Sequence, residues 1–168
     1  MGLYEFPEPL PVRRIERGFH CVTGCYIGNV RFRITCDTGC ARDFVRTQFC
    51  NQLKKDAQTK GSVILTERGS REINCTGIVT EMKTPSVTRH TTVKLRFQDV
   101  PEDGSAPMKP VSVDVVFGEM DSGADCLLLG FPTLVDWGYQ CFNDGDGNPW
   151  IRFEKFSITL PCEKPGKN

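Results

Sequence analysis

The triplet Asp37-Thr38-Gly39 has the clearest chemical potential of any short segment in this chain of 168 residues. A carboxylate at the end of a strand is held rigidly, and a glycine after it permits a tight turn and close approach of another backbone. The threonine hydroxyl can hydrogen-bond the loop. One carboxylate is not enough for amide hydrolysis, but two that share a proton supply both a base and an acid. The triplet therefore predicts one half of such a pair.

The elements that would position Asp37 are short strands separated by turns. Residues 30–35 alternate apolar and polar side chains, as a half-buried strand does, and lead directly into Asp37. Further strands are expected at 21–23, 90–98, 111–117 and 127–130, with hairpins at 61–80 (tip at 67–70) and at 150–160. Short helices are expected near 44–56 and 132–137. This pattern predicts an all-β barrel or sandwich.

Four segments resemble, in order, the retropepsin-like aspartic proteases of retroviruses and retrotransposons, and together they span about residues 21–160. The triplet alone would occur by chance in roughly one chain of this length in ten, so the order matters. The matching segments are an apolar strand with the Asp-Thr-Gly loop (30–41), a glycine-bearing hairpin like the flap (65–79), an apolar-apolar-Gly element before a short helix (125–134), and a C-terminal part typical of retrotransposon members (137–160).

The resemblance implies a closed acid-protease-like β-barrel with a flap hairpin and one or two short helices. It also implies an aspartic endopeptidase that acts as a homodimer, because each chain supplies one Asp37 and two must meet at a two-fold axis. A retroelement or viral polyprotein would be the substrate. The residues to which the resemblance assigns roles are Asp37 (catalytic), Thr38 and Gly39 (active-site loop), and Ala41, Arg68, Gly69 and Ser70 (substrate binding).

Cys40 and Ala41 depart from the family pattern, which has alanine and then a polar residue after the triplet. This departure leaves a second hypothesis open: a catalytically degenerate module of the same fold that serves as a dimeric peptide-binding or scaffold domain. A second triplet, Asp121-Ser122-Gly123, is interpreted as a turn. Leu128-Leu129-Gly130 follows it too closely to be its own partner element, and the chain is too short for two complete lobes.

Composition and charge narrow the classes of partner expected for the chain. Basic and acidic residues balance at 21 each, so nothing indicates nucleic acid or an anionic membrane surface. No apolar run approaches membrane-spanning length, and no cofactor is expected. We expect an irregular arm over 1–18, one protease-like domain over 19–162 and a short tail over 163–168.

Nine cysteines without a secretory signal peptide predict reduced thiols in a cytoplasmic protein, many of them acting as small core residues. A zinc site is the alternative, because Cys21 and Cys25, and likewise Cys36 and Cys40, lie four positions apart. No His-x-His or CxxC pair supports it, so the thiol interpretation is preferred.

Overall fold

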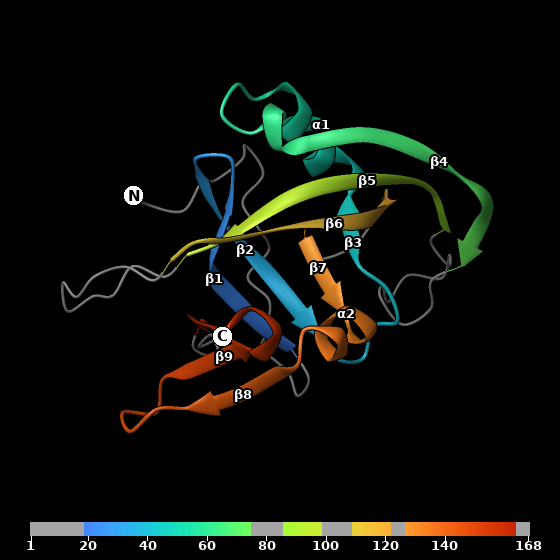
Figure 1. Cartoon of the computed structure of the whole chain (residues 1–168). Coiled ribbons are helices and arrows are strands. Elements are labelled where there is room, and N and C mark those ends of the chain that lie inside the picture. Colours follow the sequence, from blue (N-terminus) through green and yellow to red (C-terminus); the bar gives the residue numbers. More distant parts are fainter. Residues whose placement is uncertain (1–18, 75–85, 99–108, 122–126, 164–168) are drawn as a thin grey trace, which may run out of the picture.

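A ring of hydrogen-bonded strands forms the body of the protein (Figure 1). The computed structural model describes residues 19–74, 86–98, 109–121 and 127–163. In that part of the chain, one sheet has the strand order β1-β2-β7-β3-β6-β5-β4, and β1 also pairs with β5. The second pairing joins Cys25 to Phe97 and Tyr26 to Arg96, and so closes the sheet on itself. The predicted closed all-β barrel is confirmed.

The ring is built from strands whose bounds are β1 Phe19–Ile27, β2 Val30–Asp37, β3 Phe44–Arg46, β4 Val63–Asn74, β5 Ser86–Phe97, β6 Val111–Met120 and β7 Leu127–Gly130. β2 follows the predicted alternation, because Val30, Phe32 and Ile34 are buried while the two arginines between them are half-exposed. β7 is the fully buried strand expected from its apolar run.

A long hairpin of β4 and β5 extends from the ring (Figure 1). The tip was expected at residues 67–70, and this prediction is wrong, because β4 runs without a break from Val63 to Asn74. Asn74 pairs with Ser86, so the turn falls on residues 75–85, which lie outside the described part. Within β4, Glu67 and Arg68 pair with β5, and Gly69 and Ser70 fall in a register shift between Arg68 and Ile73.

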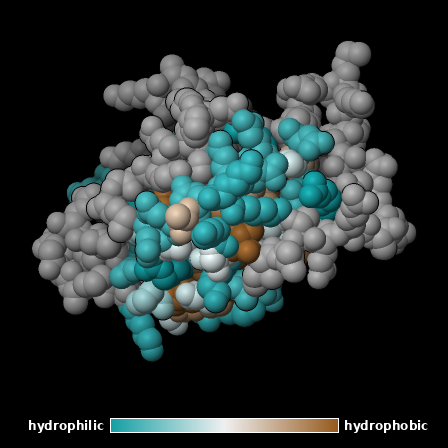
Figure 2. Space-filling view, turned by 90° about the horizontal axis from the view of Figure 1, so that it is seen from above, coloured by the Kyte–Doolittle hydropathy of each residue, from teal (hydrophilic) through white to brown (hydrophobic). Residues whose placement is uncertain are grey.

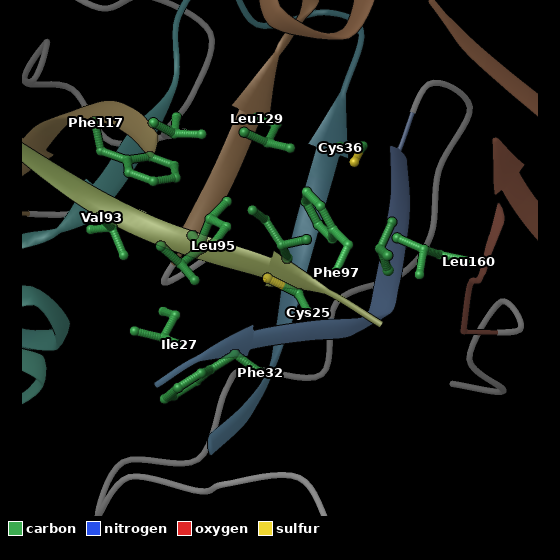
Figure 3. Packing of buried hydrophobic residues seen from close by; sticks show 14 of the residues in the cluster. Cys25, Ile27, Phe32, Cys36, Val93, Leu95, Phe97, Phe117, Leu129 and Leu160 are labelled. Carbon is green, nitrogen blue, oxygen red and sulfur yellow. The ribbon is translucent and has the colours of Figure 1, made fainter. Parts of the chain in front are cut away.

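The core fills the inside of the ring. Figure 3 shows side chains from β1, β2, β5, β6 and β7 converging, among them Phe32, Leu95, Phe97, Phe117 and Leu129. On the face shown in Figure 2, the described residues are mostly hydrophilic, with small apolar areas between them. The barrel is therefore held together by its buried apolar interior.

Two α-helices cover openings of the ring. α1 (Thr47–Lys55) buries Phe49, Cys50 and Leu53, and the Phe49 ring meets Phe32 edge-on at 5.3 Å. α2 (Phe131–Asp136) has a proline in its first turn, where no backbone donor is needed, and buries Leu134. Both predicted helices are confirmed, although residues 44–46 at the expected start of the first form β3.

A second sheet, with the order β10-β9-β8, lies at the C-terminal end of the described chain. Its strands are β8 Tyr139–Asn143, β9 Pro149–Phe153 and β10 Ile158–Pro161, and two 3-10 turns, η1 Lys60–Ser62 and η2 Glu154–Phe156, complete the structure. Trp137 joins this sheet to the barrel, because its ring lies 5.8 Å from Phe97 and 5.2 Å from Phe153. None of the helices described is long and apolar enough to cross a membrane.

Candidate functional site

Asp37 is the last residue of β2, and it lies beside the end of β7. The two strands run parallel, with Cys36 opposite Leu129 and Asp37 opposite Gly130. Figure 3 shows Cys36 and Leu129 on these neighbouring strands, immediately before the site. Two buried strands thus fix the backbone of Asp37, while its side chain remains half-exposed. The sequence prediction that a strand leads directly into Asp37 is confirmed.

The triplet forms a tight turn around its own carboxylate. The Gly39 N–H donates to Asp37 Oδ1 at 2.8 Å, and the Cys40 N–H donates to the Asp37 carbonyl at 3.2 Å. A Cβ placed on Gly39 would lie 3.2 Å from Asp37 Oδ1, which is tighter than most real contacts. Glycine at this position therefore allows its own N–H to reach and orient one carboxylate oxygen.

The rest of the loop is tied to the junction of β7 and α2. The Phe131 N–H donates to the Cys40 carbonyl at 2.7 Å. A Cβ on Gly130 would lie only 2.4 Å from the Arg42 carbonyl oxygen, so the loop backbone passes directly against this glycine. The apolar-apolar-Gly element thus supports the Asp37 loop, as the retropepsin resemblance implied.

Asp43 is the anchor of the site and was missed in the sequence. Its Oδ1 accepts the Gly130 N–H at 2.7 Å, and its Oδ2 accepts the Thr133 hydroxyl at 2.5 Å. Burial raises the pKa of Asp43, and the hydrogen bonds from Thr133 and Gly130 partly oppose that rise. Both oxygens are engaged, so Asp43 positions the loop rather than serving as a second catalytic carboxylate.

No local pattern could have identified Asp43. Its two partners lie 87 and 90 positions further along the chain, and an aspartate before a short strand is unremarkable by itself. Only the pairing of β3 with β7 brings these segments together.

Cys40 and Ala41, the departures from the family pattern, have different surroundings. Cys40 is buried, packs with Phe44, Met120 and Leu128, and its thiol lies 3.3 Å from the Arg42 carbonyl. Ala41 is exposed. Cys40 is therefore a packing residue beneath the loop, and Ala41 offers no polar side chain on its surface.

The structure does not bring Arg68, Gly69 and Ser70 to a hairpin tip. All three belong to β4, and Arg68 lies opposite Arg89 of β5. They are part of the hairpin expected to act as the flap, but its turn lies outside the described residues. Their assigned role in substrate binding remains a prediction.

Two other features of the sequence, the second Asp-containing triplet and the cysteines, can be placed in the structure. Asp121 is exposed at a bend after β6, while Ser122 and Gly123 lie outside the described part. The seven cysteines that the structure describes are free thiols, and five of them are buried: Cys25, Cys36, Cys40, Cys50 and Cys162. Burial raises the pKa of both Cys25 and Cys162 to about 12. No group of three or more metal-ligating side chains is found among the described residues.

Comparison with known proteins agrees with this geometry at the level of the fold. No protein-family model and no curated protein matches the sequence. Among solved structures, the chain is similar to the retroviral protease-like domain of Ddi1 from Leishmania major, with a TM-score of 0.54 and 12% sequence identity. The match covers 91% of this chain and 100% of that domain. The chain therefore has a retropepsin-like, acid-protease-type fold.

Proposed function

We propose that the chain is one protomer of a homodimeric aspartic endopeptidase in which two copies of Asp37 activate water for peptide-bond hydrolysis. A retroelement or viral polyprotein in a reducing, cytoplasm-like compartment is the proposed substrate. The observation that carries the proposal is the position of Asp37: it ends a buried strand on a loop that Gly39, Gly130 and Asp43 hold in place, in a fold similar to a retroviral protease-like domain.

The chemistry follows from bringing two such loops together. Like charges so close cannot both ionise easily, so the two Asp37 carboxyl groups would share one proton. The ionised carboxylate takes a proton from a water molecule, whose oxygen attacks the scissile carbonyl carbon, while the protonated partner donates to the carbonyl oxygen. The Gly39 N–H bond to Oδ1 keeps the carboxylate of each protomer oriented before they pair.

A subunit-mixing experiment tests the requirement for two carboxylates. Peptide-library digestion across pH by the purified full chain should show endopeptidase activity that Asp37→Asn abolishes. Adding an equal amount of Asp37→Asn chain to a fixed amount of wild type, with time to exchange subunits, should reduce activity to about half, because mixed dimers have a single ionisable Asp37. Undiminished activity in the mixture would show that a single chain is sufficient.

Asp121→Asn is the matched control. It makes the same chemical change in the other Asp-containing triplet, at an exposed position at the end of β6. We expect this variant to cleave like wild type and not to inhibit it in mixtures. Loss of cleavage in Asp121→Asn with normal folding, together with an active Asp37→Asn chain, would overturn the assignment.

One observation favours the second candidate, a non-catalytic dimeric peptide-binding module. Ala41 is exposed and has no polar side chain with which to fix a substrate backbone. This candidate predicts a dimer that binds extended peptides without cleaving them, and whose affinity for them is the same in wild type and in Asp37→Asn. Activity in the mixing experiment separates the two.

A further inference from the structure

One edge of β6 has no neighbouring strand over most of its length. β5 pairs with β6 from Val111 to Gly118 without a register shift, but on the other side β3 pairs only with Gly118–Met120. β3 begins at Phe44, directly after the loop that carries Asp37, so it does not extend further along β6. The segment Ser112–Val116 is therefore an open strand edge within the described structure.

The direction of the free backbone groups follows from one hydrogen bond. The Gly118 N–H donates to the Asp43 carbonyl at 3.0 Å, so it points away from β5. In an antiparallel ladder every second residue shares that direction. Hence the N–H and C=O groups of Ser112, Asp114 and Val116 also point away from β5, and the described part of the chain gives them no hydrogen-bond partner.

A hollow of about 350 Å³ lies along this edge. Asp114 and Val116 line it from β6, and Pro132, Thr133 and Asp136 line it from α2. The buried side chains of Val115 and Trp137 also border it. The hollow adjoins Asp43 rather than Asp37, so it is separate from the place where a scissile bond would lie.

The surface of the hollow combines apolar and acidic character. Its apolar part includes Val116, whose side chain is 58% exposed, and Pro132. Its three charged lining residues are all aspartates: Asp43, Asp114 and Asp136. Their charge is partly compensated, because Lys155 bonds Asp136 at 2.9 Å and Lys94 lies opposite Asp114 on β5. The charge preference of the site should thus be real but modest.

We propose that the β6 edge is a docking site for an extended, basic segment of a partner protein, which adds to the barrel as a strand. The partner backbone would bond the outward groups of Ser112, Asp114 and Val116, and a lysine or arginine of the partner would lie beside Asp114. An apolar side chain two residues from that lysine or arginine, on the same face of the sheet, would cover Val116. This site is distinct from the proposed cleft at Asp37 and does not depend on catalysis there.

A labelled probe peptide tests the backbone pairing without altering the protein. The probe is a blocked, fluorescein-labelled heptapeptide with arginine at positions 2 and 6, valine at position 4 and threonine elsewhere, and the protein is the full chain with Asp37→Asn to prevent cleavage. Two isomers are compared, one N-methylated at positions 2, 4 and 6 and one at positions 3, 5 and 7. In an added strand only one of these sets faces β6, so the two affinities should differ by at least about tenfold.

Two protein variants locate the probe. Val116→Pro removes an outward N–H from an exposed position and leaves the ladder to β5 intact, so the fold should persist while binding falls by about tenfold. The control Val116→Thr keeps the N–H and should bind within about twofold of the parent. Asp114→Asn should weaken binding about threefold and reduce its salt dependence, whereas Asp121→Asn should not.

Each other outcome contradicts the proposal. Equal affinity of the two methylated isomers, equal binding by the Pro and Thr variants at position 116, or no binding at millimolar peptide would overturn it. Sedimentation without peptide tests the other possible occupant of the edge, a second copy of the chain. If Val116→Pro dissociates a dimer that the parent forms, that second copy occupies the edge instead of a partner protein.

Discussion

Gly130→Ala should destabilise the protein strongly, because the added methyl group would clash with a neighbouring segment and not because the backbone conformation is unfavourable for alanine. The backbone of Gly130 has φ −89° and ψ 174°, a conformation that alanine adopts freely. The added Cβ, however, would lie 2.4 Å from the Arg42 carbonyl oxygen, 2.7 Å from its carbon and 2.8 Å from its nitrogen. Backbone atoms cannot swing aside as a flexible side chain can, so the loop must move by about 1 Å.

The magnitude follows from the contacts that such a movement breaks. Overpacking of this kind costs about 1–3 kcal/mol, and weakening the bonds Gly130 N–H to Asp43 and Phe131 N–H to Cys40 adds about 1–3 kcal/mol. Alanine also lowers the conformational entropy of the unfolded chain, which stabilises the folded state by about 0.4–1 kcal/mol. These terms sum to a net loss of about 1–6 kcal/mol, and the central value of about 3 kcal/mol corresponds to roughly 6–12 °C in Tm for a domain of this size.

Urea and thermal unfolding of wild type, Gly130→Ala and a matched control measure this loss. The control is Gly145→Ala, where the new Cβ would meet no atom within 4 Å, and its stability should change by less than about 1 kcal/mol. If Gly130→Ala unfolds within about 1 kcal/mol of wild type, the close packing of the loop against β7 is wrong. The proposed peptidase activity should fall further than the folded fraction, because the same movement displaces Asp37.

Three further predictions concern ionisation and burial. Since burial raises the pKa of Asp43, ionisation opposes folding: the free energy of unfolding should fall as pH rises from about 4 through the folded-state pKa, and Asp43→Asn should flatten that slope in urea titrations. The Trp150 indole and nearby backbone N–H groups lower the pKa of Asp144 to about 2. The contribution of ionised Asp144 to the free energy of unfolding is therefore fully present above about pH 3.9 and lost as pH falls through about 2. Trp150 fluorescence should accordingly titrate near pH 2 in wild type but not in Asp144→Asn. Iodoacetamide should modify exposed Cys141 long before Cys25, whose thiol is fully buried, and peptide mapping that finds equal rates would contradict the packing of β1.

Much of the fold could be predicted because its strands are marked locally. The alternation of residues 30–35 follows from a strand with one buried face, and the apolar run Leu127–Leu129 follows from burial on both faces. The tip of the hairpin was predicted wrongly for the converse reason. Gly69 and Ser70 are of turn-forming types, but residues on both sides of them pair with β5, and tertiary pairing overrode the local preference.

The sequence indicated the proposed reactive residue of the candidate site, but not the residues that support it. Asp37 could be found because the Asp-Thr-Gly triplet is contiguous and follows a strand. Asp43 could not, since its role arises from bonds to Gly130 and Thr133, 87 and 90 positions away. Local sequence thus predicts which group can react, whereas only the topology reveals what holds it still.

The contacts described for the Asp37 loop are made by residues of its own chain, and this leads to an expectation for how the proposed enzyme assembles. The bonds that orient the carboxylate, from Gly39, and those that fix its loop, through Cys40 and Asp43, are intramolecular. We therefore expect pairing of two protomers to bring the second carboxylate to a loop that is already shaped. A dissociated protomer should keep the native loop and lose the shared proton, so dimerisation would control the chemistry and leave the fold of each half-site unchanged.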